Sequence, residues 1–141
     1  MTSGKFNMYL GITALLISTF AGFALGNSLD QYFQSGHAQI PLWRYLTKAG
    51  HTHGMPFGLI NIIFGLIIAH AAGSDRLKTA GAVLTALSLL LPVGVALRGL
   101  TEGAKFAEGI AMAGGFSFIA ACVTMILCVR SSPVTSKGQA G

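Results

Sequence analysis

The chain has 141 residues, of which 52% are hydrophobic and only 9% are charged, and its mean hydropathy is +0.67. A soluble domain carries charge on about 25% of its residues, so this sequence cannot cover an ordinary soluble core with polar surface. No segment between the apolar runs is long enough for a separate catalytic domain. The nine basic residues are scattered rather than gathered into a patch, which excludes nucleic acid as the expected partner.

Four apolar runs with almost no charge follow one another along the chain. Each is about as long as the ~20 residues that cross a bilayer as a helix, and backbone amides in hydrocarbon must be paired within their own segment. We therefore predict an all-α, four-helix transmembrane bundle over residues 1–130, with the lipid bilayer as its first partner. The predicted helices cover residues 8–28, 54–73, 79–97 and 106–129, and the polar segment 131–141 is predicted to be a disordered tail.

The first apolar run follows Lys5, as the apolar part of a secretory signal peptide follows a basic residue. Its apolar core is longer than the ~7–15 residues of a signal peptide, and no clean Ala-x-Ala cleavage site comes after it. We therefore expect residues 8–28 to be retained as the first membrane helix.

The connection between the first and second runs contains a helical signal of its own. Pro41 suits the first position of a helix, and Leu42, Tyr45 and Leu46 then fall on one face, with Trp43 beside them. Apolar and aromatic side chains on one face are typical of a helix that lies at the level of the lipid headgroups. The sequence predicts a short interfacial helix here, which would anchor the bundle.

The basic residues predict the orientation of the bundle. With four spans, the N-terminus, the second turn and the C-terminal segment share one membrane side, which carries five basic residues against four on the other side. Short loops rich in Lys and Arg stay in the cytoplasm, and the compact turn that contains Arg76 and Lys78 is such a loop. We expect a multi-pass protein of the bacterial inner (plasma) membrane with both termini cytoplasmic, so that the connection 30–53 faces outward.

Small residues recur at spacings that allow membrane helices to pack closely. In lipid there is little hydrophobic driving force between helices, so close backbone approach at small residues holds them together. The spacing serves either packing within one bundle or the formation of a homo-oligomer or of contacts with other membrane subunits. The glycines predicted to pack are Gly22 and Gly26, Gly54 and Gly58, and Gly109 and Gly115.

Polar side chains gather at the end of the bundle that is predicted to face outward. Such a cluster at one end of a membrane bundle indicates a functional site. Arg98 serves there either as an anchor that reaches the headgroups or as a counter-charge for an anionic ligand, a quinone headgroup or a proton path. The predicted polar site consists of Asp30, Arg98, Glu102 and Glu108, beside the histidines at the start of the second helix.

His51, His53 and Met55 are the candidate metal ligands. Imidazole is the commonest metal ligand in proteins, a His, His, Met set suits copper, and His with a carboxylate suits zinc or iron. Haem would need a second axial ligand, from Met112, His37 or another subunit. Two arguments oppose a metal: the positive end of a helix dipole disfavours a cation, and three residues do not complete a coordination shell. The alternative is that these histidines are solvated or hydrogen-bonded.

The start of the second helix, His51-x-His53, resembles that of a group of small four-helix bacterial membrane proteins that are remotely similar to helices of haem-copper oxidase subunit I. Gly58, the four-span plan, and Pro92 and Arg98 late in the third span carry the rest of the resemblance. The resemblance implies the helical plan and brings no activity. The chain lacks the several mid-helix histidines that bind haem in oxidases, which argues against oxygen chemistry.

No nucleophile elbow, phosphate loop, HExxH or CxxC motif occurs, so we do not expect an enzyme. The leading hypothesis is an integral membrane accessory or structural protein with an outward-facing polar site, within a larger membrane assembly. The alternative is a metal- or haem-binding protein of respiratory redox chemistry, with copper or another transition metal, or a haem shared between subunits. A small-solute transporter ranks third, because four spans without an internal repeat offer no obvious pathway.

Overall fold

The computed structural model describes residues 3–34 and 41–131, and all regular structure in these residues is helical. The third and fourth helices together form one apolar segment, Asp75–Leu100, so the described residues contain four candidate membrane spans. The predicted all-α four-helix bundle is confirmed. The helices are α1 (Ser3–Gln34), α2 (Leu42–His70), α3 (Asp75–Ser88), α4 (Leu90–Leu100) and α5 (Lys105–Arg130).

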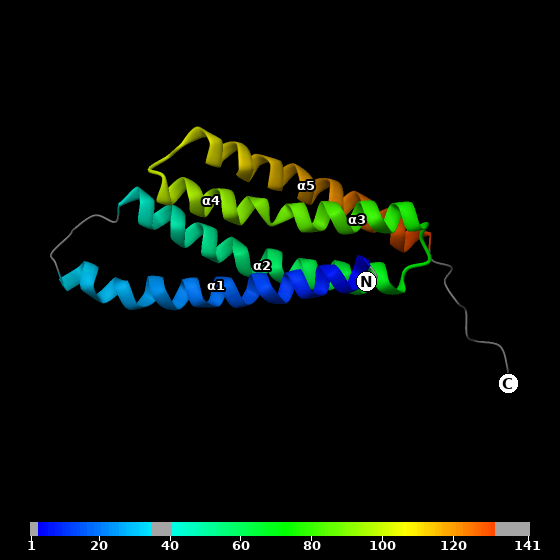
Figure 1. The fold of residues 1–141 in the computed structure, drawn as a ribbon, viewed down its shortest axis with the longest axis horizontal. Coiled ribbons are helices and arrows are strands. Elements are labelled where there is room, and N and C mark those ends of the chain that lie inside the picture. The colour runs from blue at the N-terminus through cyan, green and yellow to red at the C-terminus, as the bar shows by residue number, and fades with distance from the viewer. Residues whose placement is uncertain (1–2, 35–40, 132–141) are drawn as a thin grey trace.

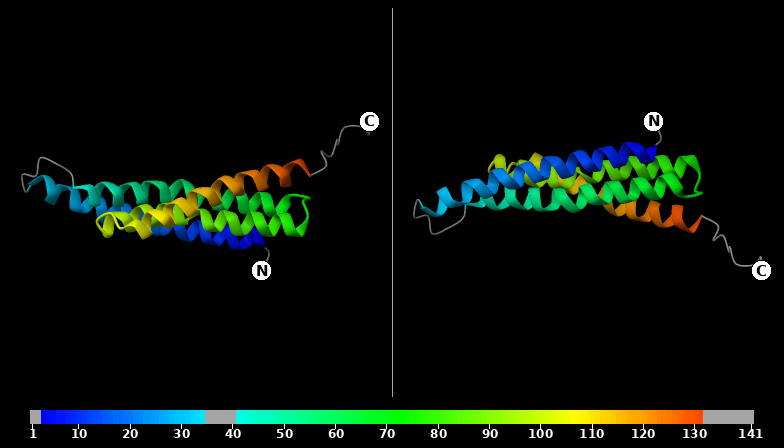
Figure 2. Two further views of the ribbon diagram at one scale, coloured as in Figure 1. Left: turned by 90° about the horizontal axis from the view of Figure 1, so that it is seen from above. Right: turned by 90° about the horizontal axis from the view of Figure 1, so that it is seen from below.

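The spans run up and down, with α2 alongside α1 and with α3, α4 and α5 on the other side of α2 (Figures 1 and 2). The start of α1, the α2–α3 turn and the end of α5 lie at one end of the bundle, which we call the terminal end. The end of α1, the start of α2 and the α4–α5 turn lie at the opposite end, which we call the distal end. This arrangement agrees with the four-span plan predicted from the apolar runs.

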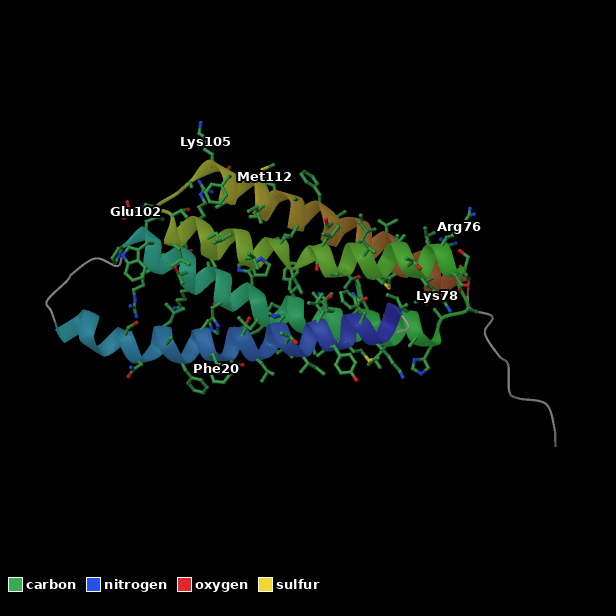
Figure 3. All side chains as sticks on the ribbon, viewed as in Figure 1. Phe20, Arg76, Lys78, Glu102, Lys105 and Met112 are labelled. Atoms are coloured by element: carbon green, nitrogen blue, oxygen red, sulfur yellow. The ribbon has the colours of Figure 1, made fainter. Side chains whose placement is uncertain are left out.

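Large apolar side chains face outward and small or polar ones face inward. Phe20 and Phe23 are each 71% exposed, whereas Asn7, Asn61 and Thr85 are completely buried. Figure 3 shows Phe20 pointing away from the other helices. Water would penalise this distribution, but lipid favours it, because acyl chains solvate the large apolar groups while polar groups find partners inside the bundle. The chain is a multi-pass membrane protein.

The second helix begins twelve residues before its predicted start at residue 54. The short interfacial helix is therefore not a separate element, and that part of the prediction is wrong: its residues are the first turns of α2, on which Leu42 and Tyr45 are exposed. Hydropathy reports which residues a bilayer holds, whereas a helix continues as long as its backbone hydrogen bonds do. The continuous helix carries Arg44 to a buried position facing α1.

The third span is interrupted at Leu89, between α3 and α4. Pro92 has no N–H and its ring collides with the carbonyl group of Ser88, so regular helical bonding cannot continue through this turn. The Leu89 N–H donates to the Ala86 carbonyl at 3.2 Å instead, in a tighter turn. The interruption leaves the Thr85 carbonyl to side-chain donors, among them the Ser88 hydroxyl at 2.6 Å.

The buried apolar core lies towards the terminal end, around Ile68, Ala82 and Met125. Nearer the middle of the bundle, Phe57 of α2 packs against Phe118 of α5 with 5.0 Å between the ring centroids. These contacts join α2, α3 and α5. The attachment of α1 to the bundle rests on a different kind of contact, which also builds the candidate site.

Candidate functional site

α1 and α2 run antiparallel, and the contacts between them repeat every seven residues along each helix. We call this line of contact the seam. At its terminal half only glycine fits: a Cβ on Gly4 would lie 2.5 Å from the Gly65 carbonyl oxygen, and a Cβ on Gly11 would lie 2.5 Å from that of Gly58. Such closeness brings Cα–H groups against carbonyl oxygens, which stabilises membrane helix pairs. The facing pairs along the seam are Gly4 with Gly65, Gly11 with Gly58, Ser18 with His51, and Leu25 with Arg44.

At its distal half the same register is filled by side-chain donors. His51 donates from Nδ1 to the Ser18 carbonyl at 2.6 Å. Arg44 donates from Nη2 to the Leu25 carbonyl at 2.8 Å and from Nη1 to the Ser28 hydroxyl at 3.0 Å. Arg44 is only 6% exposed, so its charge is buried together with hydrogen-bond acceptors that compensate for the lost water.

The bond to Ser18 determines the tautomer of His51. A carbonyl oxygen only accepts, so Nδ1 carries the proton, and in the neutral imidazole Nε2 is then a hydrogen-bond acceptor. The described residues place no hydrogen-bond donor on Nε2. Gly22 leaves room for the ring against α1, because a Cβ there would lie 2.5 Å from Cε1 and 2.9 Å from Nε2.

His51 lines a cleft of about 350 Å³ between α1 and α4. This volume is at the lower end of the ~300–1,000 Å³ of small-molecule sites. The floor is α2, where Gly50 and Gly54 let the neighbouring helices pack closely: a Cβ on Gly50 would lie 2.6 Å from the Ala96 Cβ, and a Cβ on Gly54 would collide with the Ser18 hydroxyl. The rims are exposed to lipid, since Ile17 of α1 is 65% exposed and Val93 of α4 is 49% exposed. The cleft thus opens sideways, towards the acyl chains of the bilayer.

A buried polar network connects α1, α2 and α3 nearer the terminal end. Asn7 donates from Nδ2 to Asn61 Oδ1 at 3.2 Å and to the Ala82 carbonyl at 2.9 Å. Asn61 in turn donates from Nδ2 to the carbonyls of Phe57 and Thr85, at 3.0 and 3.1 Å. These amides bind the carbonyl groups of Ala82 and, beside the helix break, of Thr85, whereas the buried Asn7 Oδ1 has no hydrogen-bond partner among the described residues.

The predicted polar site is only partly assembled. Arg98 Nη2 lies 3.3 Å from Glu108 Oε2, and both side chains are nearly half exposed. Arg98 also lines a second hollow of about 220 Å³ with Glu102 and Trp43. Figure 3 shows Glu102 at the α4–α5 turn, opposite the end of the bundle that holds Arg76 and Lys78. The side chain of Asp30 lies outside the described residues.

The histidine motif is not brought together with this ion pair, contrary to the single polar cluster that we expected. His51 faces α1, whereas His53 is exposed on another side of α2 and donates within its own helix to the Ala49 carbonyl at 2.7 Å. Met55 is 42% exposed and does not line the cleft. Two residues along a helix differ by about 200° in direction, so His51 and His53 cannot converge once α2 continues through them.

The described residues contain no group of three or more His, Cys, Asp or Glu placed to hold a metal ion. Met112, an expected haem partner, lines a different hollow with Arg98 and Glu108, and His37 lies outside the described residues. Metal or haem binding therefore stays a prediction.

The packing glycines divide into two sets. Gly54 and Gly58 are buried against Ser18 and Gly11, Gly22 makes room for His51, and Gly115 is in ordinary contact with Leu91. The prediction of packing within the bundle is wrong for Gly26 and Gly109, where a Cβ would meet nothing within 4 Å. Both glycines point away from the neighbouring helices, because adjacent members of an i, i+4 pair need not face the same neighbour.

Sequence reasoning missed Ser18, Arg44 and the seam as a whole. A signal was present: Gly4, Gly11, Ser18 and Leu25 are seven residues apart, and so are Arg44, His51, Gly58 and Gly65. A seven-residue repeat of this kind keeps one face of a helix towards a single partner. The four-residue spacing of small residues does not reveal a seam whose members include His and Arg.

Comparison of the chain with protein-family models, with curated proteins and with solved structures finds no match. The resemblance to small four-helix bacterial membrane proteins therefore stays a prediction, and the functional argument rests on the cleft.

Proposed function

We propose that this chain is an integral membrane accessory protein that performs no chemistry of its own and holds a lipophilic small molecule in the cleft between α1 and α4. The observation that carries the proposal is His51. Its Nδ1 is committed to the Ser18 carbonyl, and its Nε2 is left as an acceptor beside a cleft with otherwise mainly apolar walls. A mainly apolar pocket with one oriented polar group is the usual form of a small-molecule site.

The proposed location is the bacterial inner membrane with cytoplasmic termini. Arg44 is counted at the distal end in the sequence, but its side chain is buried against α1. The terminal end, in contrast, has exposed Lys5, Arg76 and Arg130. Because basic residues at short cytoplasmic loops set orientation, this difference favours a cytoplasmic terminal end. Cysteine labelling at an engineered Lys105→Cys, with a reagent that does not cross membranes, tests this orientation.

Filling the cleft tests the binding function. Ala14 lines the cleft, and Ala24 lies on the same helix but is exposed and does not line it. Ala14→Phe should remove lipophilic material that co-purifies in mild detergent at near-stoichiometric amounts, as measured by mass spectrometry of extracts, whereas Ala24→Phe should retain it. Equal retention by both variants, or the absence of any such material from the unmodified protein, would contradict the proposal.

Haem or metal binding is the second proposed function, and the same His51 nitrogen supports it. A metal-ligating histidine donates its other nitrogen to a carbonyl or carboxylate, as His51 does to Ser18. The expected result is a visible absorption spectrum of the purified oligomer that disappears in His51→Ala and persists in His53→Ala. A colourless protein without bound metal would remove this second proposal and leave the first unaffected.

A further inference from the structure

We propose that the molecule in the cleft is a neutral lipid with one apolar chain and a hydroxyl headgroup, alcoholic or phenolic, whose O–H donates to Nε2 of His51. This inference deepens the proposed function and rests on it. It follows from four properties of the cleft: its charge, its shape, its polarity from end to end, and the hydrogen-bond acceptor that Nε2 of His51 provides.

The cleft carries no compensating charge for an ionic headgroup. Its lining includes no Asp, Glu, Lys or Arg among the described residues. Arg98 and Glu108 border other hollows and are paired with each other. Since an unpaired charge in an apolar site is strongly unfavourable, an anionic phospholipid headgroup and an ammonium group are both poor occupants.

The cleft is elongated along the helices and has one polar end. Its α1 wall extends from Leu10 to Ala21, which is about 16 Å at 1.5 Å per residue. His51 lies at the level of Ser18, near the Ala21 end, and the wall towards Leu10 is apolar apart from Thr13, whose hydroxyl donates to the Tyr9 carbonyl. A lipid with its headgroup towards the distal end and its chain towards the middle of the bilayer matches this gradient.

A headgroup that faces Nε2 of His51 must supply the hydrogen of that bond, and the Ser18 hydroxyl, which also lines the cleft, is the other polar group beside it. In the neutral ring, Nε2 of His51 only accepts, so a ketone, ether or ester oxygen placed against it would leave two acceptors facing each other. A hydroxyl group donates its hydrogen to Nε2. Because a hydroxyl buried without a partner is unfavourable, this hydrogen bond stabilises the bound ligand. The geometry thus distinguishes a hydroxyl lipid from its own methyl ether, which has almost the same shape.

The test compares hydroxyl probes with their methyl ethers on the protein in lipid nanodiscs. Equilibrium dialysis measures binding of radiolabelled 4-decylphenol and its methyl ether, and of 1-dodecanol and its methyl ether, against empty nanodiscs. The hydroxyl member of at least one pair should bind about tenfold more tightly, the gain of one well-made hydrogen bond. Preference for the phenol assigns a quinol-like ligand, and equal preference in both pairs assigns any hydroxyl lipid. Equal binding of hydroxyl and ether in both pairs would overturn the inference.

Variants test whether His51 is the residue that distinguishes the hydroxyl probe from its ether. In His51→Leu the preference for the hydroxyl should disappear, and in the matched control His53→Leu it should persist, because His53 lies outside the cleft. Nitrogen-15 NMR of histidine-labelled unmodified protein gives a readout that needs no variant to fold. The hydroxyl probe should shift the Nε2 resonance of His51, and the ether should not. A shift by both probes, or by neither while the phenol is bound, would refute the O–H···Nε2 bond.

The outcomes separate this inference from the function beneath it. If hydroxyl and ether bind equally and Ala14→Phe abolishes both, the cleft binds lipids and only the headgroup assignment is wrong. If Ala14→Phe leaves binding of every probe unchanged, or no probe binds, the cleft is not the site, and the proposed function and the inference are both wrong.

Discussion

The two halves of the α1–α2 seam share one register but are built from different chemistry. In the terminal half, Gly4 and Gly11 let the two backbones touch. In the distal half, His51 and Arg44 stand at the equivalent positions and reach across to α1 carbonyls with N–H donors. The distal half also packs closely, since a Cβ on Gly22 would lie 2.5 Å from the His51 ring. The difference is that its long side chains add hydrogen bonds across the seam, which turn His51 and Arg44 towards α1.

The largest expected effect comes from breaking the glycine half. Gly11→Leu should lower the free energy of unfolding by about 3 kcal/mol, since its side chain would collide with the Gly58 carbonyl and Ile62 and the helices would have to separate. Gly26→Leu is the matched control on the same helix, and it should change stability by less than about 0.5 kcal/mol because nothing lies within 4 Å of its Cβ position. Unfolding in mixed SDS micelles, followed by circular dichroism, measures both. Equal effects would show that the seam is not closely packed.

A smaller effect is expected from the donor half. Arg44→Met keeps much of the apolar stem and removes the guanidinium donors to Leu25 and Ser28, which should lower the unfolding free energy by about 2 kcal/mol. Lys48→Met, one turn further along α2 and exposed, serves as control. The same unfolding assay applies. A loss no greater than that of Lys48→Met would contradict the claim that side-chain donors hold this half.

The smallest effect lies outside the seam, at the α4–α5 turn. Glu102 has a positive φ of 51°, which glycine adopts without the crowding of a Cβ. Glu102→Gly should therefore raise the unfolding free energy by about 0.5 kcal/mol, whereas Glu102→Ala, which removes the same charge but keeps the Cβ, should not. Thermal unfolding of the two variants side by side measures the difference. If Glu102→Ala stabilises as much as Glu102→Gly, charge and not backbone conformation accounts for the gain.

Much of the fold was predictable because it depends on length and hydropathy. The four spans, and the placement of the start of α1 and the end of α5 at one end of the bundle, follow from the number of apolar runs. The start of α2 was not predictable in this way, since Arg44, Lys48 and His51 are polar residues within a helix whose backbone bonding continues through them. Of the predicted site residues, Arg98 pairs with Glu108, whereas His51 lines another cleft together with Ser18, which the sequence did not single out.

The sequence by itself therefore determined the class of protein and its number of spans, because transfer of a side chain into lipid is a property of each residue. Only the tertiary structure decided that His51 and not His53 turns towards α1, that Gly22 leaves room for its ring, and that Gly26 and Gly109 face outward. The physical reason is rotation about the helix axis. The hydropathy of these helices is nearly the same on every face, so it does not determine how each helix is rotated about its axis. Contacts with residues that lie far away in the sequence determine that rotation.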